Sequence, residues 1–102
     1  MQIKEIKNGK KDFLDLLLLA DEQEDMVDRY LERGRMFVLD DGGIKAECVV
    51  TDEGGGVLEI KNIATVPKSQ GKGYGKKLMS SPFLKKTQIF SKVFSEPLPI
   101  GI

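Results

Sequence analysis

The chain has 102 residues, of which 40% are hydrophobic and 31% are charged, and its sixteen basic and sixteen acidic side chains cancel. This composition excludes a largely disordered chain, and the length is that of one small domain with its own core. The apolar run over residues 13–20 is broken by Asp15 and is far shorter than the roughly 20 residues that cross a bilayer. We therefore expect one domain over residues 1–102 with no membrane partner.

The missing residue types exclude several chemistries. Histidine is absent and Cys48 is the single cysteine, which removes histidine-based triads, most zinc sites and any internal disulfide. Cys48 is predicted to be a core residue of a strand and not a nucleophile. Lys4 and Glu5 stand where a signal peptide would need apolar residues, so a cytoplasmic location is expected, with no metal cofactor.

Charge is unevenly distributed along the chain. Residues 12–59 carry fourteen acidic against four basic side chains, a balance of −10, whereas residues 60–102 carry eight lysines against one glutamate, a balance of +7. The asymmetry predicts an anionic ligand near the later segment and a cationic one near the earlier segment. The alternative interpretation is that both segments simply form solvated faces of a globular domain. Nucleic acid is not an expected partner, because aromatic platforms and a high isoelectric point are absent.

The first third of the chain predicts a strand followed by two helices. Residues 2–7 form a short strand, and apolar residues at helical spacing predict a helix over about residues 10–20. Asp21 with Glu24 three positions later resembles a capping box at the start of a second helix. Gly34 is its expected stop.

The middle of the chain predicts three antiparallel strands. These cover residues 36–39, 44–51 and 57–66, and they are separated by glycine-containing turns. Strict alternation in the third strand would place two sets of side chains on opposite faces, namely Leu58, Ile60, Ala64 and Val66 on one and Glu59, Lys61, Ile63 and Thr65 on the other. Pro67 is expected to end this strand.

A basic, glycine-rich loop over residues 68–75 follows the third strand and leads into a helix that begins near Gly75. Glycines let backbone N–H groups approach a pyrophosphate closely. The positive end of the helix dipole and the positive charges of the lysines attract the same anion. A Walker A loop would require glycine at Gln70 and serine or threonine at Lys77, and the GxGxG spacing differs from the Rossmann GxGxxG. Neither nucleotide motif fits.

Residues 58–67 together with residues 70–78 closely resemble the central motif of the GNAT superfamily of acyl-CoA-dependent N-acetyltransferases. Gln70, Gly73 and Gly75 occupy the three defined positions of its (Gln/Arg)-x-x-Gly-x-(Gly/Ala) loop pattern. The order of strand, two helices and three-strand meander also matches, so the resemblance covers roughly residues 1–79. It implies an α+β fold with a mixed, mainly antiparallel sheet and flanking helices.

The resemblance further implies that acetyl-CoA is the co-substrate. The main chain of residues 70–75 would wrap its pyrophosphate, and the strand end at residues 63–66 would pair with its pantetheine. The residues so implied are Ile63, Ala64, Thr65, Val66, Gln70, Gly71, Lys72, Gly73, Tyr74 and Gly75.

Direct attack of an acceptor amine on the thioester requires a base for the ammonium proton and an acid for the leaving thiolate. Glu59 is the candidate base by resemblance, and its alternative is an exposed ion pair with Lys61 or Lys45. The acid is often a tyrosine after the fifth strand in this superfamily, but no tyrosine follows Gly75. Tyr30 and Tyr74 are expected to be a core and an interface side chain.

Residues 80–102 depart from the family pattern, since Ser80-Ser81-Pro82 should interrupt the helix and little room remains for the usual later strands. We expect a fold that is incomplete at its C-terminus, by natural truncation, a frameshifted end or a minimal variant of the family. Its atypical apolar tail is expected to pair with a second copy, which predicts a homodimer. The expected function is N-acetylation of a primary amine on a small molecule or protein. The alternative is a catalytically inactive coenzyme A-binding or protein-interaction module.

Overall fold

A computed structural model describes residues 1–55, 57–82, 84 and 88–91. Its elements, in chain order, are β1 (Gln2–Ile6), the 3-10 turn η1 (Lys10–Phe13), α1 (Leu14–Ala20), α2 (Glu24–Leu31), β2 (Arg35–Asp40), β3 (Ile44–Gly54), β4 (Val57–Thr65), the 3-10 turn η2 (Pro67–Ser69), α3 (Tyr74–Met79) and β5 (Gln88–Ser91). The strands form one sheet in the order β1-β2-β3-β4-β5, antiparallel except for the parallel pair β4 and β5. The predicted mixed, mainly antiparallel α+β fold is confirmed.

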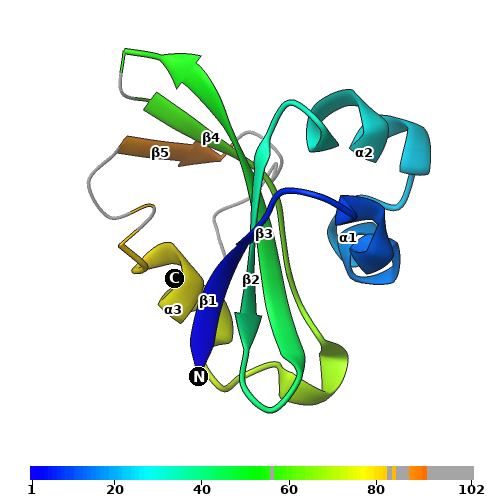
Figure 1. Cartoon of the computed structure of the whole chain (residues 1–102), viewed down its shortest axis with the longest axis vertical. Coiled ribbons are helices and arrows are strands. Elements are labelled where there is room, and N and C mark those ends of the chain that lie inside the picture. The colour runs from blue at the N-terminus through cyan, green and yellow to red at the C-terminus, as the bar shows by residue number, and fades with distance from the viewer. Residues whose placement is uncertain (56, 83, 85–87, 92–102) are drawn as a thin grey trace.

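The sheet lies between two helical layers, with α1 and α2 on one face and α3 on the other (Figure 1). Strand β2 shows why, because its consecutive apolar residues serve both layers. Met36 and Val38 pack with α1 and α2, whereas Phe37 and Leu39 pack with α3, and none of the four is accessible to solvent. A strand segment buried on both faces is expected to be continuously apolar, and residues 36–39 of β2 are.

The start of α2 differs from the sequence expectation. Gln23 is the N-cap residue, and no side chain caps the helix. The carboxylate of Asp21 instead accepts a hydrogen bond of 3.2 Å from the hydroxyl of Tyr30. The capping box predicted from Asp21 and Glu24 is therefore wrong. Asp21 lies two residues before the N-cap, and its side chain bonds to Tyr30 of α2 and not to the helix backbone.

The end of α2 is held by a buried lysine and a glycine. Lys10 Nζ donates to the carbonyl oxygens of Leu31 at 2.9 Å and Gly34 at 2.7 Å, which supplies donors to a helix end that lacks them. A Cβ atom at Gly34 would lie 2.9 Å from the carbonyl oxygen of Tyr30 and 2.9 Å from Val49 Cγ1. Gly34 is thus required by the close approach of α2 to β3.

Strand β4 contains a bulge that the alternation in its sequence does not reveal. Val49 pairs with Asn62 whereas the next residue, Val50, pairs with Ile60, so Lys61 is the extra residue. Ile60 and Ile63 consequently pack on the same side, with α3, although strict alternation placed them on opposite faces. The predicted facial assignment is wrong beyond Ile60, and the bulge changes the direction of the strand's side chains next to the candidate base.

Most of the predicted atypical tail, namely residues 83, 85–87 and 92–102, lies outside the described residues. Met79 is the last residue of α3, as predicted from Ser80-Ser81-Pro82, and Leu84 is buried in the core beside α3. Within the described ranges, α2 is the longest helix with eight residues, and none of the helices has the length and apolar character needed to cross a membrane.

Candidate functional site

The glycine-rich loop joins the end of β4 to the start of α3. Gly71 and Gly73 have φ angles of 82° and 81°, a region in which only glycine is unstrained. A Cβ atom at either position would meet no other atom within 4 Å, so the backbone conformation and not crowding requires glycine. Gln70 Nε2 donates to the carbonyl oxygen of Thr65 at 3.3 Å, which ties the loop to the strand end.

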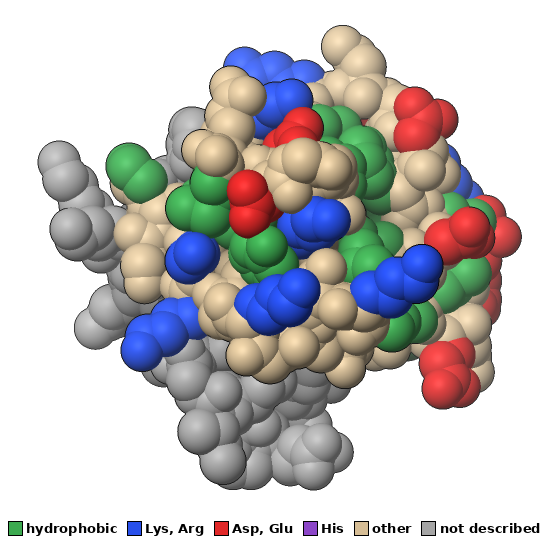
Figure 2. Space-filling model, turned by 90° about the horizontal axis from the view of Figure 1, so that it is seen from below, with side chains coloured by type: hydrophobic (Ala, Val, Ile, Leu, Met, Phe, Trp, Pro, Cys, Tyr) green, Lys and Arg blue, Asp and Glu red, His purple; other side chains and the backbone are tan. Residues whose placement is uncertain are grey.

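This loop presents a row of unused backbone donors. The N–H groups of residues 71–76 donate no hydrogen bond to any described residue, and the first N–H that does so again is that of Lys77, to the Gly73 carbonyl at 3.0 Å. Consecutive free N–H groups at a helix start form a site for an anion. Lys68, Lys72, Lys76 and Lys77 surround it with exposed positive charge, and Figure 2 shows several basic side chains on this end of the molecule.

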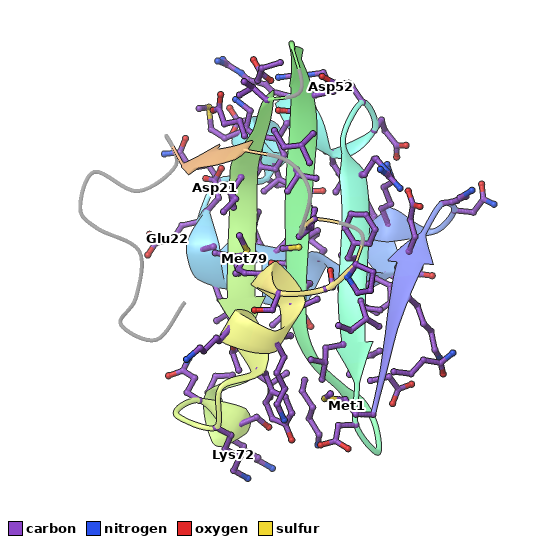
Figure 3. All side chains as sticks on the ribbon, turned by 90° about the vertical axis from the view of Figure 1, so that its left-hand side faces the viewer. Met1, Asp21, Glu22, Asp52, Lys72 and Met79 are labelled. Carbon is purple, nitrogen blue, oxygen red and sulfur yellow. The ribbon has the colours of Figure 1, made fainter. Side chains whose placement is uncertain are left out.

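Strand β4 has an open edge next to the loop. The described part of β5 pairs with Val57 through Ile60, whereas β3 pairs with β4 as far as Thr65. In Figure 3, β5 lies beside the upper part of β4, and the loop that carries Lys72 lies at the opposite end. Among the described residues, positions 61–65 of β4 therefore offer backbone groups on one side, and these include three of the four residues predicted to pair with pantetheine.

The predicted base is buried and paired. Glu59 is only 4% exposed, and its Oε1 accepts a hydrogen bond of 2.7 Å from Lys61 Nζ. The ion pair with Lys61 that formed the alternative to a catalytic role is thus present, but Glu59 is not the exposed side chain which that alternative assumed. Glu59 and Lys61 line a cleft of about 490 Å³ between α2 and β4, together with Ala20, Asp21, Met26, Arg29, Tyr30 and Arg33.

Both tyrosine hydroxyls are already hydrogen-bonded. The Tyr30 hydroxyl donates to Asp21 and accepts from Asn62 Nδ2 at 3.0 Å, and burial raises the pKa of Tyr30 to about 12. The Tyr74 hydroxyl donates to Asp41 at 2.7 Å, which raises the pKa of Tyr74, and its ring is part of the core between α3 and the sheet. Tyr74 was predicted to bind the cofactor, and what it offers to a ligand is its backbone N–H group.

Two buried polar residues near the cleft were not singled out from the sequence. Asn62 Nδ2 donates to the carbonyl oxygen of Leu17 at 2.9 Å, but its Oδ1 has no hydrogen-bond partner among the described residues. Both carboxyl oxygens of Glu47 are likewise buried without such a partner, and burial raises the pKa of Glu47 well above its usual value. Cys48 is fully buried, as predicted, and burial also raises the pKa of its thiol.

No described group of three or more histidine, cysteine, aspartate and glutamate side chains has the arrangement of a metal site. The described residues place a loop of unused backbone N–H groups beside an open strand edge, with a buried carboxylate in the neighbouring cleft. Such a combination suits a substrate with a phosphate-bearing arm and a proton transfer at its other end.

No protein-family model matches the chain. An uncharacterized N-acetyltransferase of Bacillus subtilis (strain 168), YvbK, is 42% identical over 66 residues, which are 64% of this chain and 43% of that protein. The structure of an IAA acetyltransferase from Bacillus cereus ATCC 14579 is 38% identical with a TM-score of 0.69, over 76% of this chain and 52% of that one. A GNAT family acetyltransferase from Elizabethkingia anophelis, with acetyl-CoA bound, is 33% identical with a TM-score of 0.72, over 82% of this chain and 56% of that one.

These similarities assign the chain to the GNAT superfamily of acetyltransferases. A Bacillus subtilis acetyltransferase in complex with CoA has the same fold, with 35% identity and a TM-score of 0.68 over 76% of this chain and 52% of that one. The chain spans about half the length of the relatives that it matches. Its structural neighbours bind acetyl-CoA or CoA.

Proposed function

We propose that this chain binds acetyl-CoA and transfers its acetyl group to a primary amine. The observation that carries the proposal is the row of free N–H groups over residues 71–76, placed directly beyond the open edge of β4. The loop would hold the pyrophosphate, and the edge at residues 63–66 would pair with the pantetheine arm. Related proteins with acetyl-CoA or CoA bound support this assignment.

Glu59 is the proposed general base. The amine nitrogen attacks the thioester carbonyl, a C–N bond forms, the C–S bond breaks, and the CoA thiolate leaves. The attacking nitrogen must lose a proton, and Glu59 lies in the cleft beside β4 with its carboxylate held by Lys61. Glu59 is only 4% exposed, and a buried carboxylate interacts more strongly with a cationic amine than an exposed one does, because the local dielectric constant is lower.

Acetyl-CoA binding, measured by calorimetry on the 102-residue chain, tests the proposal with two substitutions at one position. Gly73→Glu is expected to weaken binding by at least about 10-fold, because it adds a negative charge and a side chain where the phosphates bind. Gly73→Ala introduces the same strain at positive φ without the charge, at a cost of about 1 kcal/mol in stability. Equal affinities for acetyl-CoA in Gly73→Glu and Gly73→Ala would contradict the proposed phosphate site.

The second candidate is a coenzyme A-binding or protein-interaction module without turnover. It is favoured by the state of the two tyrosines, because both hydroxyls are hydrogen-bonded to aspartate and neither is free to protonate a thiolate. Binding of acetyl-CoA without release of free thiol in the presence of amines would favour this module over the enzyme.

The acceptor class, the cytoplasmic location and the homodimer go beyond what the fold supports and remain predictions. We propose an amine of a small molecule or protein as the acceptor. The homodimer was predicted from the apolar tail, most of which lies outside the described residues. The mass in solution scattering tests it, and a monomer would overturn it.

A further inference from the structure

The cleft beside Glu59 carries more positive charge than the sequence around it suggests. Residues 12–59 contain fourteen acidic and only four basic residues, yet two of the four, Arg29 and Arg33, line this cleft. Lys61 adds a third positive charge, and Asp21 and Glu59 supply the two negative ones. The cleft therefore has a formal net charge of +1 within a segment that is strongly acidic.

The partners of these side chains show which charges are available to a ligand. Glu59 is neutralised by Lys61, and one carboxylate oxygen of Asp21 accepts the Tyr30 hydroxyl. Arg33 Nη1 lies 3.8 Å from Glu53 Oε2, a long contact for an ion pair, and the Arg33 side chain is 55% exposed. The guanidinium of Arg29 forms no ion pair with any described residue.

The two arginines are placed to act together. They are four residues apart, so the turn of α2 and its continuation bring both side chains to the same side of the helix. Arg33 Nε donates to the backbone carbonyl oxygen of Arg29 at 3.4 Å, which holds the Arg33 side chain against the last turn of α2. Arginine pairs of this kind bind carboxylates and phosphates through charge-assisted, often bidentate hydrogen bonds.

We propose that the acceptor is a small primary amine that also carries an anionic group, which Arg29 and Arg33 bind while the amine faces Glu59. This inference rests on the proposed acetyl transfer and names its substrate class. The rest of the lining suits a short aliphatic spacer, because Ala20, Met26 and the ring of Tyr30 are apolar. The cleft volume of about 490 Å³ is that of a small-molecule site. The acidic composition of residues 12–59 predicted a cationic ligand, and the cleft changes this expectation to a ligand that carries both an ammonium and an anionic group.

Matched pairs of amines test the anionic group directly. Release of CoA thiol from acetyl-CoA is measured with glycine, β-alanine and 4-aminobutanoate, each against the alkylamine of equal carbon number, and with the corresponding aminoalkylphosphonates. We expect at least about a 10-fold higher kcat/KM for the anionic member of the best pair. The carboxylate and phosphonate arms identify which anion is preferred. Equal values across every pair, or preference for the alkylamine, would overturn the proposal.

Arginine variants test where the anion binds. Arg29→Gln and Arg33→Gln are each expected to raise KM for the preferred anionic amine by about 10-fold or more, with kcat and the KM for the matched alkylamine within about 3-fold. Arg35→Gln is the control, because Arg35 carries the same charge but lies on β2 and pairs with Glu5. An equal effect of all three substitutions would mean that the net charge of the protein, and not a specific site, determines KM for the anionic amine, which would contradict the proposal.

Calorimetry separates failure of this inference from failure of the proposed function. If acetyl-CoA binds but no amine is acetylated, the catalytic proposal fails, and titration of the same amines into the CoA-loaded chain still decides the acceptor class. Tighter binding of the anionic members, lost in Arg29→Gln, supports the inference. Binding of neither member, or of both equally, overturns it.

Discussion

Glu59→Gln is expected to lower kcat for acetyl transfer by about 10²- to 10⁴-fold, the usual contribution of a general base. Glutamine has nearly the same size as glutamate, and its carbonyl oxygen can still accept the hydrogen bond from Lys61. The substitution therefore removes the proton acceptor while preserving most of the packing. Affinity for acetyl-CoA should stay within about 2-fold, because the loop proposed to bind the phosphates is a different segment, residues 70–75.

The kinetic measurement needs a matched control and a check of folding. Glu22→Gln makes the same chemical change at an exposed position just before α2 and should leave kcat unchanged. Thermal unfolding shows whether loss of the Glu59 charge destabilises the chain. A folded Glu59→Gln protein with kcat within about 3-fold of the parent would mean that the Glu59–Lys61 pair is structural and that the base lies elsewhere.

The first four strands, the glycine loop and the short third helix were predictable because each rests on local signals, whereas β5 (Gln88–Ser91) lies in the segment that was expected to be an atypical tail. Positive φ at Gly71 and Gly73 demands glycine, and Pro67 ends β4, so these features are visible in the sequence itself. The bulge at Lys61 was not predictable, since the apolar pattern of β4 does not show which residue lacks a partner on β3. The capping box at Asp21 was wrongly predicted for a similar reason, because the hydrogen-bond partner of Asp21 is the hydroxyl of Tyr30, which lies nine residues away in the sequence.

The chemistry of the cleft was only partly predictable. Glu59 was found through its place in a family motif, but its burial comes from packing between β4 and α2 that no local pattern shows. The two cleft arginines were hidden by the acidic average over residues 12–59, because charge balance along a chain does not report where a fold brings charges together. The acidic composition of this segment thus favoured a cationic ligand, whereas the arginines that line the cleft favour a ligand with an anionic group.

Glu47 is expected to make the free energy of unfolding decrease as pH rises. Burial without a described hydrogen-bond partner raises its pKa above the usual value of 4.5, so the folded state binds this proton more tightly than the unfolded state. The stabilising effect is complete below pH 4.5 and is lost as pH rises toward the folded pKa. The slope between the two pKa values is about −1.4 kcal/mol per pH unit.

Urea unfolding of the parent chain and Glu47→Gln between pH 5 and pH 7 measures this effect. The unfolding free energy of the parent should fall relative to that of the variant as pH rises over this interval, because the variant has no proton to lose. Tyr30 and Cys48 are the neighbouring titratable groups, and burial raises the pKa of each, so neither ionises in this range. Glu32→Gln, at an exposed position, should follow the parent curve. Parallel curves for Glu47→Gln and the parent would mean that Glu47 is ionised in the folded state and that a polar group or water compensates its charge.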